Sequence, residues 1–297
     1  MGQARRKRWG PCRCGSNLAA VACCWTSQSF HKTPQRIDLH NTGATGRRDG
    51  CYMLATHGCS DTLSREHLIS EGVLGVLAEK TVTVTGLPWL KGQTKELPFS
   101  ALVASNLCTR HNSLLSPIDD AGAKLFEAVQ TCGTTAASPS LEFLLSGHDV
   151  ERWLLRSLAV MGVSRNLAID GAAIDQDFVD RLRIVELLEK PRAWARPIGL
   201  YVLGGQGHQF TQRADVQLAP LMRRDTSELI GITVDIQGLA LGLLATEHDI
   251  TGTLLDRAFY RPAALVFDMA GIKHRITLSW EDRGSHVDVV LTWKPSP

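Results

Sequence analysis

The order of hydrophobic and polar residues along the chain predicts strands in some stretches and helices in others. Residues 80–86 (KTVTVTG) are a run of β-branched residues and predict a strand, and residues 96–105 (ELPFSALVAS) predict a second one. Residues 149–162 predict an amphipathic helix, because one helical face collects Val150, Trp153, Leu154, Ser157, Leu158 and Met161. A further helix is expected over residues 175–190, ahead of Pro191.

A helix is also expected to begin near Ser116. Serine is a common helix cap and Pro117 suits the first helical turn, while Asp119 and Asp120 are favourable near the positive end of the helix dipole. We expect this helix to run to about Gln130. The two acidic residues therefore have a structural explanation and need not be ligands.

From Pro197 onward the pattern changes to strands separated by glycine and charged residues. The predicted segments are 198–204, 214–222, 229–245, 263–270, 274–280 and 286–293. They indicate an antiparallel sheet packed on the two preceding helices. Residues 26–50 show no hydrophobic period and read as a linker, and residues 131–140 (TCGTTAASPS) mark a boundary.

A chain of 297 residues usually forms two or more domains. Net charge is +2, but a basic arm holds Arg5, Arg6, Lys7, Arg8 and Arg13, which could contact phosphate or be a solvated tail. No hydrophobic run reaches bilayer length and no secretory signal is visible, so we expect no membrane segment. Eight cysteines in short-range pairs favour metal sites in a reducing, cytoplasmic compartment.

Residues 12–24 (CRCGSNLAAVACC) bring four cysteines together from two close pairs. Such a set can close a tetrahedral zinc site on a segment too short to have a core. The segment resembles the SEC-C zinc motif, with ligands Cys12, Cys14, Cys23 and Cys24 and a turn at Gly15 and Ser16. It departs from that family between the pairs, where Asn17, Leu18, Ala19 and Ala20 replace the usual lysines. The resemblance implies structural zinc and a protein or DNA contact.

The central stretch 59–120 carries the candidate chemistry. Hydrolysis of a phosphodiester with one metal requires a base for water, a divalent cation and ligands for that cation. Glu66 and His67 are adjacent, and Asn112 follows the Cys108-x-x-His111 knuckle. Adjacent side chains on a strand face opposite ways, so both reach one site only if the strand ends or bends there.

These residues, with Leu107, resemble the Glu-His variant of the HNH, or ββα-metal, endonucleases. The resemblance implies that His67 is the general base and that Glu66 and Asn112 hold catalytic magnesium or manganese. Asn106 is the nearest candidate for the asparagine that braces the hairpin. Many such hairpins also hold a structural zinc. Its ligands would be Cys108, His111, Cys59 and either Cys51, which we favour, or His57.

Several other residues are candidates for contacts with nucleic acid. The loop 86–95 carries Trp89, Lys91 and Lys95, which could contact DNA or simply pack on their own domain. Arg65 directly precedes the Glu-His pair, and Arg110 lies within the knuckle. Four further histidines have no metal spacing: His208, His248, His274 and His286. Motifs for ATP binding and for acyl transfer by a serine nucleophile are lacking.

The sequence thus predicts an α+β protein in four parts. They are a SEC-C knuckle with its basic arm (1–28), a linker that lets the knuckle move (29–48), a zinc-stabilised HNH hairpin-helix domain (49–135) and a helical plus antiparallel C-terminal domain (141–297). The expected function is a metal-dependent DNA endonuclease that cuts one strand per site, in bacterial defence or mobile-element biology. The alternative is a non-catalytic zinc-binding module that recognises nucleic acid or a protein. An open cation position between Glu66 and Asn112 would distinguish the enzyme from the module.

Overall fold

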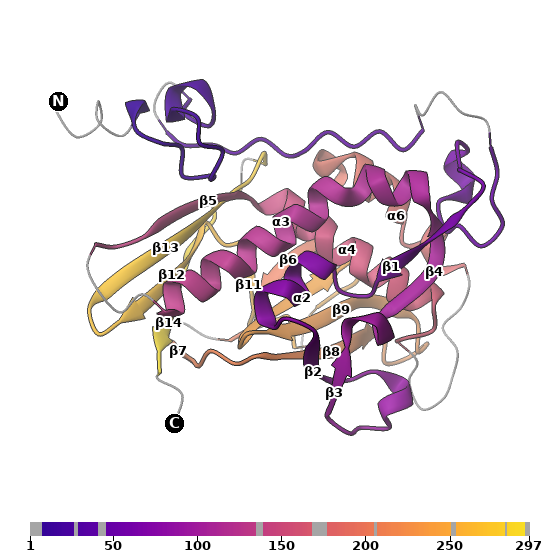
Figure 1. Cartoon of the computed structure of the whole chain (residues 1–297). Helices are drawn as coiled ribbons and strands as arrows, with labels where there is room; N and C mark the ends of the chain where they lie inside the picture. Colours follow the sequence, from indigo (N-terminus) through magenta and orange to yellow (C-terminus); the bar gives the residue numbers. More distant parts are fainter. Residues whose placement is uncertain are drawn as a thin grey trace.

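A computed structural model describes the fold. It covers residues 8–26, 29–40, 46–134, 139–167, 177–204, 207–250, 254–282 and 284–294. The protein is of mixed α/β type, with two large sheets, few helices and one long helix that crosses the molecule (Figure 1).

The two strands of a small antiparallel sheet lead into the longest helix. Strand β1 (Leu63–His67) pairs with β4 (Val103–Cys108), and α3 (Thr109–Thr134) begins at the next residue. The helix therefore starts before the predicted cap at Ser116, and Pro117 lies inside it. Its buried residues His111, Leu115 and Ile118 follow the helical period, so packing overrides the local capping signal. Helix α2 (Glu71–Leu77) lies beside α3.

A seven-stranded sheet has the order β11-β6-β10-β9-β8-β2-β3. Its outermost members β2 (Thr81–Thr85) and β3 (Lys95–Pro98) come from between the two hairpin strands, and β2 pairs with β8 in parallel. The other strands are β6 (Gly199–Val202), β8 (Asp215–Met222), β9 (Leu229–Ile236), β10 (Leu239–Leu244) and β11 (Phe259–Tyr260).

A five-stranded sheet has the order β5-β13-β12-β14-β7. Its strands are β5 (Glu142–Ser146), β7 (His208–Phe210), β12 (Ala264–Met269), β13 (Ile272–Ser279) and β14 (Asp288–Trp293). Only β12 and β13 pair antiparallel; β5 with β13, β12 with β14 and β14 with β7 are parallel. The prediction of an antiparallel C-terminal sheet is therefore confirmed for β11, β6, β10, β9 and β8, which pair antiparallel with one another, and wrong for β14 and β7, whose pairs are parallel.

Helix α4 (Gly147–Val163) lies at the centre of the protein. Every residue from Gly147 to Gly162 is buried, so this helix is enclosed on all sides rather than packed through one face. The predicted helix 175–190 appears in the described residues as α5 (Phe178–Arg181) and α6 (Ile184–Glu189). Arg183 separates them in a left-handed conformation, with φ of 52°.

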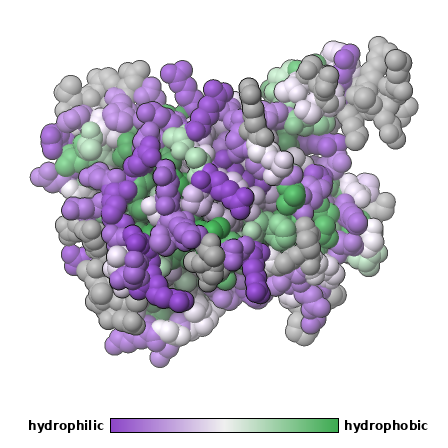
Figure 2. Space-filling view, turned by 180° about the vertical axis from the view of Figure 1, so that it is seen from behind, coloured by the Kyte–Doolittle hydropathy of each residue, from purple (hydrophilic) through white to green (hydrophobic). Residues whose placement is uncertain are grey.

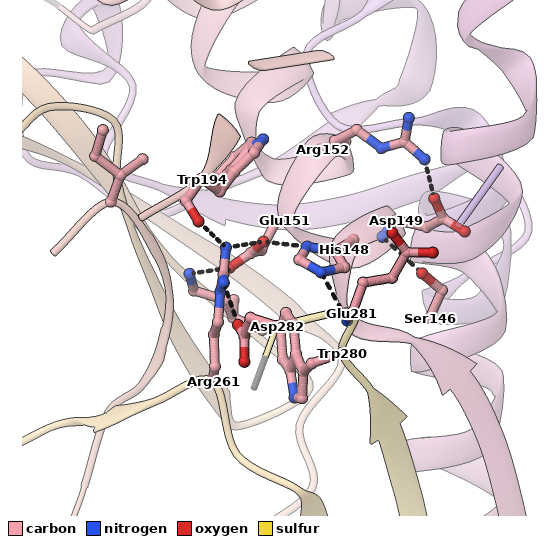
Figure 3. Close-up of polar contacts among 12 residues, drawn as sticks. Ser146, His148, Asp149, Glu151, Arg152, Trp194, Arg261, Trp280, Glu281 and Asp282 are labelled. Carbon is pink, nitrogen blue, oxygen red and sulfur yellow. Dashed lines mark hydrogen bonds and ion pairs between the residues drawn. The ribbon is translucent and has the colours of Figure 1, made fainter. Parts of the chain in front are cut away.

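The charged side chains at the start of α4 are paired. Glu151 is fully buried and accepts hydrogen bonds from Arg261, at 2.7 Å from Nε and 3.0 Å from a terminal nitrogen (Figure 3). Arg261 also pairs with Asp282 and lies against the rings of Trp280 and Tyr260. This network fixes the helix to the C-terminal strands, because a buried charge is stable only when it is paired.

One hydrophobic core runs through the predicted domain boundaries. It extends from Ile37 and Leu39 in the predicted linker to Leu291 in β14. The knuckle is attached to the body as well, since Leu144 of β5 donates a backbone hydrogen bond to Arg13 and packs against two of its cysteines. The described residues of the knuckle therefore pack on the body of the protein, and its movement relative to the body stays a prediction.

Seen from behind, the surface is mostly hydrophilic, with smaller hydrophobic areas between the hydrophilic residues (Figure 2).

Candidate functional site

The first candidate metal site is the N-terminal knuckle. One ligand atom from each of its four cysteines lies within 4.8 Å of the others: Cys12, Cys14, Cys23 and Cys24. The Sγ atoms of Cys14 and Cys23 are 3.4 Å apart, and those of Cys23 and Cys24 are 3.5 Å apart. Tetrahedral zinc separates thiolate sulfurs by about 3.8 Å. The knuckle therefore fits zinc with only small adjustments.

Short hydrogen bonds hold the knuckle in this shape. The Cys12 amide donates to the carbonyl of Leu18 at 2.8 Å, and Gly15 takes a φ of 74° in the turn that follows the first pair of ligands. The Ser16 hydroxyl donates to the sulfur of Cys23 at 3.1 Å. Donation to a thiolate tunes its charge and orients it toward the metal.

A second candidate metal site joins the loop before β1 to the start of α3. Its four members are fully buried and again have their ligand atoms within 4.8 Å of one another: Cys51, Cys59, Cys108 and His111. The Nδ1 atom of His111 lies 3.5, 3.8 and 3.2 Å from the three sulfurs in that order. Tetrahedral zinc would place nitrogen and sulfur ligands about 3.6 Å apart.

The structure places Cys51, and not His57, in this second cluster. Residues 54–56 form a short 3-10 turn (Leu54–Thr56), after which His57 takes a φ of 57° and is exposed. Its ring therefore faces solvent while the neighbouring backbone brings Cys59 inward.

Thr56 is a member of this site that the sequence did not indicate. Its Oγ1 lies 3.0 Å from Nε2 of His111 and donates to the backbone carbonyl of Met53 at 2.8 Å. When Nδ1 of His111 binds a metal, Nε2 carries the proton and donates it to this hydroxyl. Thr56 therefore fixes the tautomer that a metal requires.

Burial disfavours the charged form of two thiols in this cluster, whereas the pKa of the third, Cys108, is lowered by hydrogen bonds in spite of its burial. Burial raises the pKa of Cys51 to about 12 and also raises the pKa of Cys59. Metal binding requires thiolates, so binding expels protons and weakens as the pH falls. Burial also raises the pKa of Cys132 to about 12, and this cysteine belongs to neither cluster, as expected of an inert thiol.

The candidate catalytic residues lie at the end of β1 and in the first turn of α3. Glu66 and His67 lie at the end of β1, where the register with β4 shifts between Ser64 and Glu66. Glu66 is 1% exposed, whereas the His67 side chain is 18% exposed. Asn112, in the first turn of α3, is half-buried beside them. The bend that the sequence required is therefore present.

A guanidinium from α4 occupies the centre of this group. One terminal nitrogen of Arg156 lies 3.1 Å from the Glu66 carboxylate and donates to Asn112 Oδ1 at 3.4 Å. The other lies 3.2 Å from Asp119 and donates to the His67 carbonyl at 3.4 Å. The sequence indicated neither Arg156 nor the part played by Asp119.

Burial is the main cause of the electrostatic changes here. It raises the pKa of Glu66 to about 7, against the opposing effect of Arg156, and raises the pKa of Asp119 to about 6. Burial also raises the pKa of Tyr52, whose hydroxyl donates to Glu66 at 3.2 Å. The pKa of His67 is lowered by burial, so its imidazole is neutral near pH 7.

Magnesium does not fit this arrangement. The oxygen atoms of Glu66, Asn112 and Asp119 are the donors that a hard divalent cation prefers. They surround the guanidinium of Arg156, whose side chain is only 3% exposed. The open cation position expected between Glu66 and Asn112 is thus filled by a side chain of the protein itself.

The remaining predicted residues lie outside this group. Asn106 is buried and its Nδ2 donates to the Val160 carbonyl of α4 at 3.2 Å. Arg65 and Lys91 are exposed, and Arg110 is half-buried. In the same loop as Lys91, Trp89 donates from Nε1 to Asn166 at 3.0 Å, so that loop is partly anchored to the predicted C-terminal domain.

In the basic arm, the described residue Arg8 is exposed and stacks on Trp9. Arg5, Arg6 and Lys7 lie outside the described residues. None of the scattered histidines joins a metal cluster within the part of the chain that the structure describes.

Comparison of the chain with protein-family models, curated proteins and solved structures found no match. The interpretation of both clusters and of the Arg156 group therefore depends on the geometry of this chain alone. None of the described helices is long and apolar enough to cross a membrane.

Proposed function

We propose that the chain is an endonuclease of the HNH, or ββα-metal, type that hydrolyses DNA phosphodiester bonds. The observation that carries this proposal is the convergence of Glu66, Asn112 and the backbone carbonyl of His67 on the guanidinium of Arg156, although Asn112 follows the other two by more than forty residues. An antiparallel strand pair that leads directly into a helix also supports the proposal.

Within this proposal His67 is the general base. Its imidazole is partly exposed, and burial keeps it neutral, so it can accept a proton from water at pH 7. The carboxylate of Glu71 lies 3.9 Å from Nδ1 and favours an orientation that leaves Nε2 for the water. Arg65 is exposed on the same strand and could contact a neighbouring phosphate.

Structural zinc in both clusters is part of the proposal. In the hairpin, Cys51 and Cys59 would hold the loop before β1 against Cys108 and His111 at the start of α3. Bound zinc supplies a rigid cross-link between these segments and needs no role in the reaction. The thiolates and the imidazole would thereby fix the angle at which α3 presents Asn112.

A plasmid cleavage assay with the zinc-loaded full chain tests the function. Supercoiled and single-stranded DNA would be incubated with magnesium, with manganese and without added divalent ions. We expect wild type to nick the plasmid and His67→Ala to lose about 10²–10⁴-fold in rate. His57→Ala is the matched control, because His57 is exposed and outside both clusters. Cleavage that survives His67→Ala, or a wild type that cuts neither substrate, would contradict the proposal.

A second candidate function is a zinc-built module that binds nucleic acid or a protein without cutting. The observation that favours it is Arg156, which fills the position that an enzyme would keep open for its cation. Gel-shift assays separate the two candidates. A module binds DNA equally well as wild type and as His67→Ala and leaves it intact under every metal condition.

A further inference from the structure

Arg156 is an unusual member of the candidate catalytic group, because it carries a permanent positive charge into a nearly solvent-free position. Its side chain is 3% exposed and that of Glu66 is 0% exposed. Its contacts come from two separate elements, since Glu66 and His67 belong to β1 and Asn112 and Asp119 belong to α3. The ion pair between Arg156 and Glu66 is therefore part of the core of the hairpin and not of the surface.

The terminal nitrogens of Arg156 lie against four groups of the protein. A guanidinium has two N–H groups on each terminal nitrogen and one on Nε. The four terminal N–H groups face Glu66, Asn112, Asp119 and the carbonyl of His67. Nε is buried and makes no hydrogen bond among the described residues. In this position both terminal nitrogens of Arg156 face groups of the protein itself and the side chain is 3% exposed, so it acts on the acidic group and not on a substrate.

The acidic group nevertheless retains binding capacity. Oε2 of Glu66 is buried and accepts no hydrogen bond among the described residues, although a carboxylate can accept several. Glu66, Asp119 and Asn112 together offer the oxygen atoms that a hard divalent cation prefers. A divalent cation placed among them would lie within a few ångströms of the guanidinium, and like charges at that distance in a buried site repel strongly.

We propose that Arg156 is the resident cation of this group and competes with a divalent metal ion for Glu66, Asn112 and Asp119. Arg156 in place excludes the metal, and withdrawal of Arg156 creates the metal site. The inference rests on the proposed function for the idea that a cation belongs at this position. It deepens that function by naming the residue that controls access.

Binding of Mn²⁺ to the zinc-loaded full chain, without DNA, tests the inference. Free Mn²⁺ is measured by electron paramagnetic resonance, and manganese is a weak competitor for zinc sites. We compare wild type with Arg156→Gln, with Arg156→Lys as the control that keeps a positive charge, with Glu66→Gln alone, and with Arg156→Gln combined with Glu66→Gln. Arg156→Met serves as a second neutral replacement. Zinc content and circular dichroism establish that each variant is folded.

We expect Arg156→Gln to bind one Mn²⁺ at least about tenfold more tightly than wild type. Addition of Glu66→Gln should remove this gain, and Arg156→Lys should resemble wild type. Tight Mn²⁺ binding by wild type that is lost in Glu66→Gln alone overturns the proposal, whatever the Arg156 variants do. Equal affinities for wild type and the folded neutral variants also overturn it.

This result is separable from the nuclease assay. If wild type and the neutral variants all fail to cut DNA but only the neutral variants bind Mn²⁺, the proposed function fails and the competition by Arg156 stands. If wild type cuts DNA and binds Mn²⁺ with Arg156 in place, the function stands and the competition fails.

Discussion

Replacement of Thr56 by valine tests whether the second cluster is a zinc site whose histidine is oriented by a hydrogen bond between its Nε2 and Thr56. Valine keeps the shape of threonine but cannot accept the proton of His111 Nε2, which lies 3.0 Å from the hydroxyl. His111 is fully buried, so its N–H would have no water to bond instead. The ring would lose both its orientation and part of its basicity as a ligand.

The expected loss follows from this single hydrogen bond. Removal of the group that orients a metal-bound histidine costs about 10–100-fold in metal affinity, or about 1.4–2.7 kcal/mol. Valine also leaves the carbonyl of Met53 without the hydrogen bond it receives from Thr56 at 2.8 Å. Thr56→Ser is the matched control, because it keeps the hydroxyl and removes only a methyl group.

Competition against a chromophoric zinc chelator gives the two zinc affinities of the full chain. The N-terminal knuckle is an internal reference, because its four cysteine ligands belong to a separate cluster that does not include His111. We expect Thr56→Val to weaken one of the two sites and leave the other unchanged, and Thr56→Ser to weaken neither. Equal zinc affinities for Thr56→Val and wild type would refute the reasoning, as would a loss at both sites.

Three further predictions concern the core, the base and the sheet. Arg261→Met should cost about 3–5 kcal/mol in urea unfolding, because it leaves the buried carboxylate of Glu151 without its cation. Arg261→Met combined with Glu151→Met should cost less, and a double-variant cost equal to the sum of the two single costs would show that the two side chains do not interact. Burial lowers the pKa of His67, so cleavage should be lost as the pH falls through a midpoint below about 6.5. A pH–rate profile with a higher midpoint would argue against His67 as the general base. Gly86→Ala should cost at least about 2 kcal/mol, because φ is 97° and the new methyl would lie 1.7 Å from a backbone oxygen of β8. Gly92→Ala, with φ of 76° and open space, should cost less in the same unfolding assay.

The sequence predicted the two metal clusters because metal ligands leave short, regular spacings. Close pairs such as Cys108 and His111 must converge whatever the rest of the fold does. The choice between Cys51 and His57 could not be made from spacing, which gives the reach of a loop and not the direction of its side chains. That direction depends on the turn before His57 and its positive φ of 57°.

Arg156 was missed because the stretch around it was interpreted only through its hydrophobic face. A helix buried on all sides cannot leave its charges in water, so Glu151 and Arg156 had to find partners elsewhere. The charged residues within this hydrophobic helix were visible in the sequence, but the sequence did not indicate which residues pair with them. Pairing across long separations, as between β2 and β8, is likewise invisible to local patterns.

The central position of α4 changes the role of the C-terminal half of the chain. From this helix Arg156 reaches the candidate catalytic group, and the Val160 carbonyl accepts a hydrogen bond from Asn106 of β4. At its other end Glu151 is fixed by Arg261. A fragment limited to residues 49–135 would therefore leave the Glu66 carboxylate without its cation and expose the core that β2 shares with β8. The hairpin and the C-terminal sheets share one hydrophobic core, and the geometry of the candidate site is set jointly by both halves.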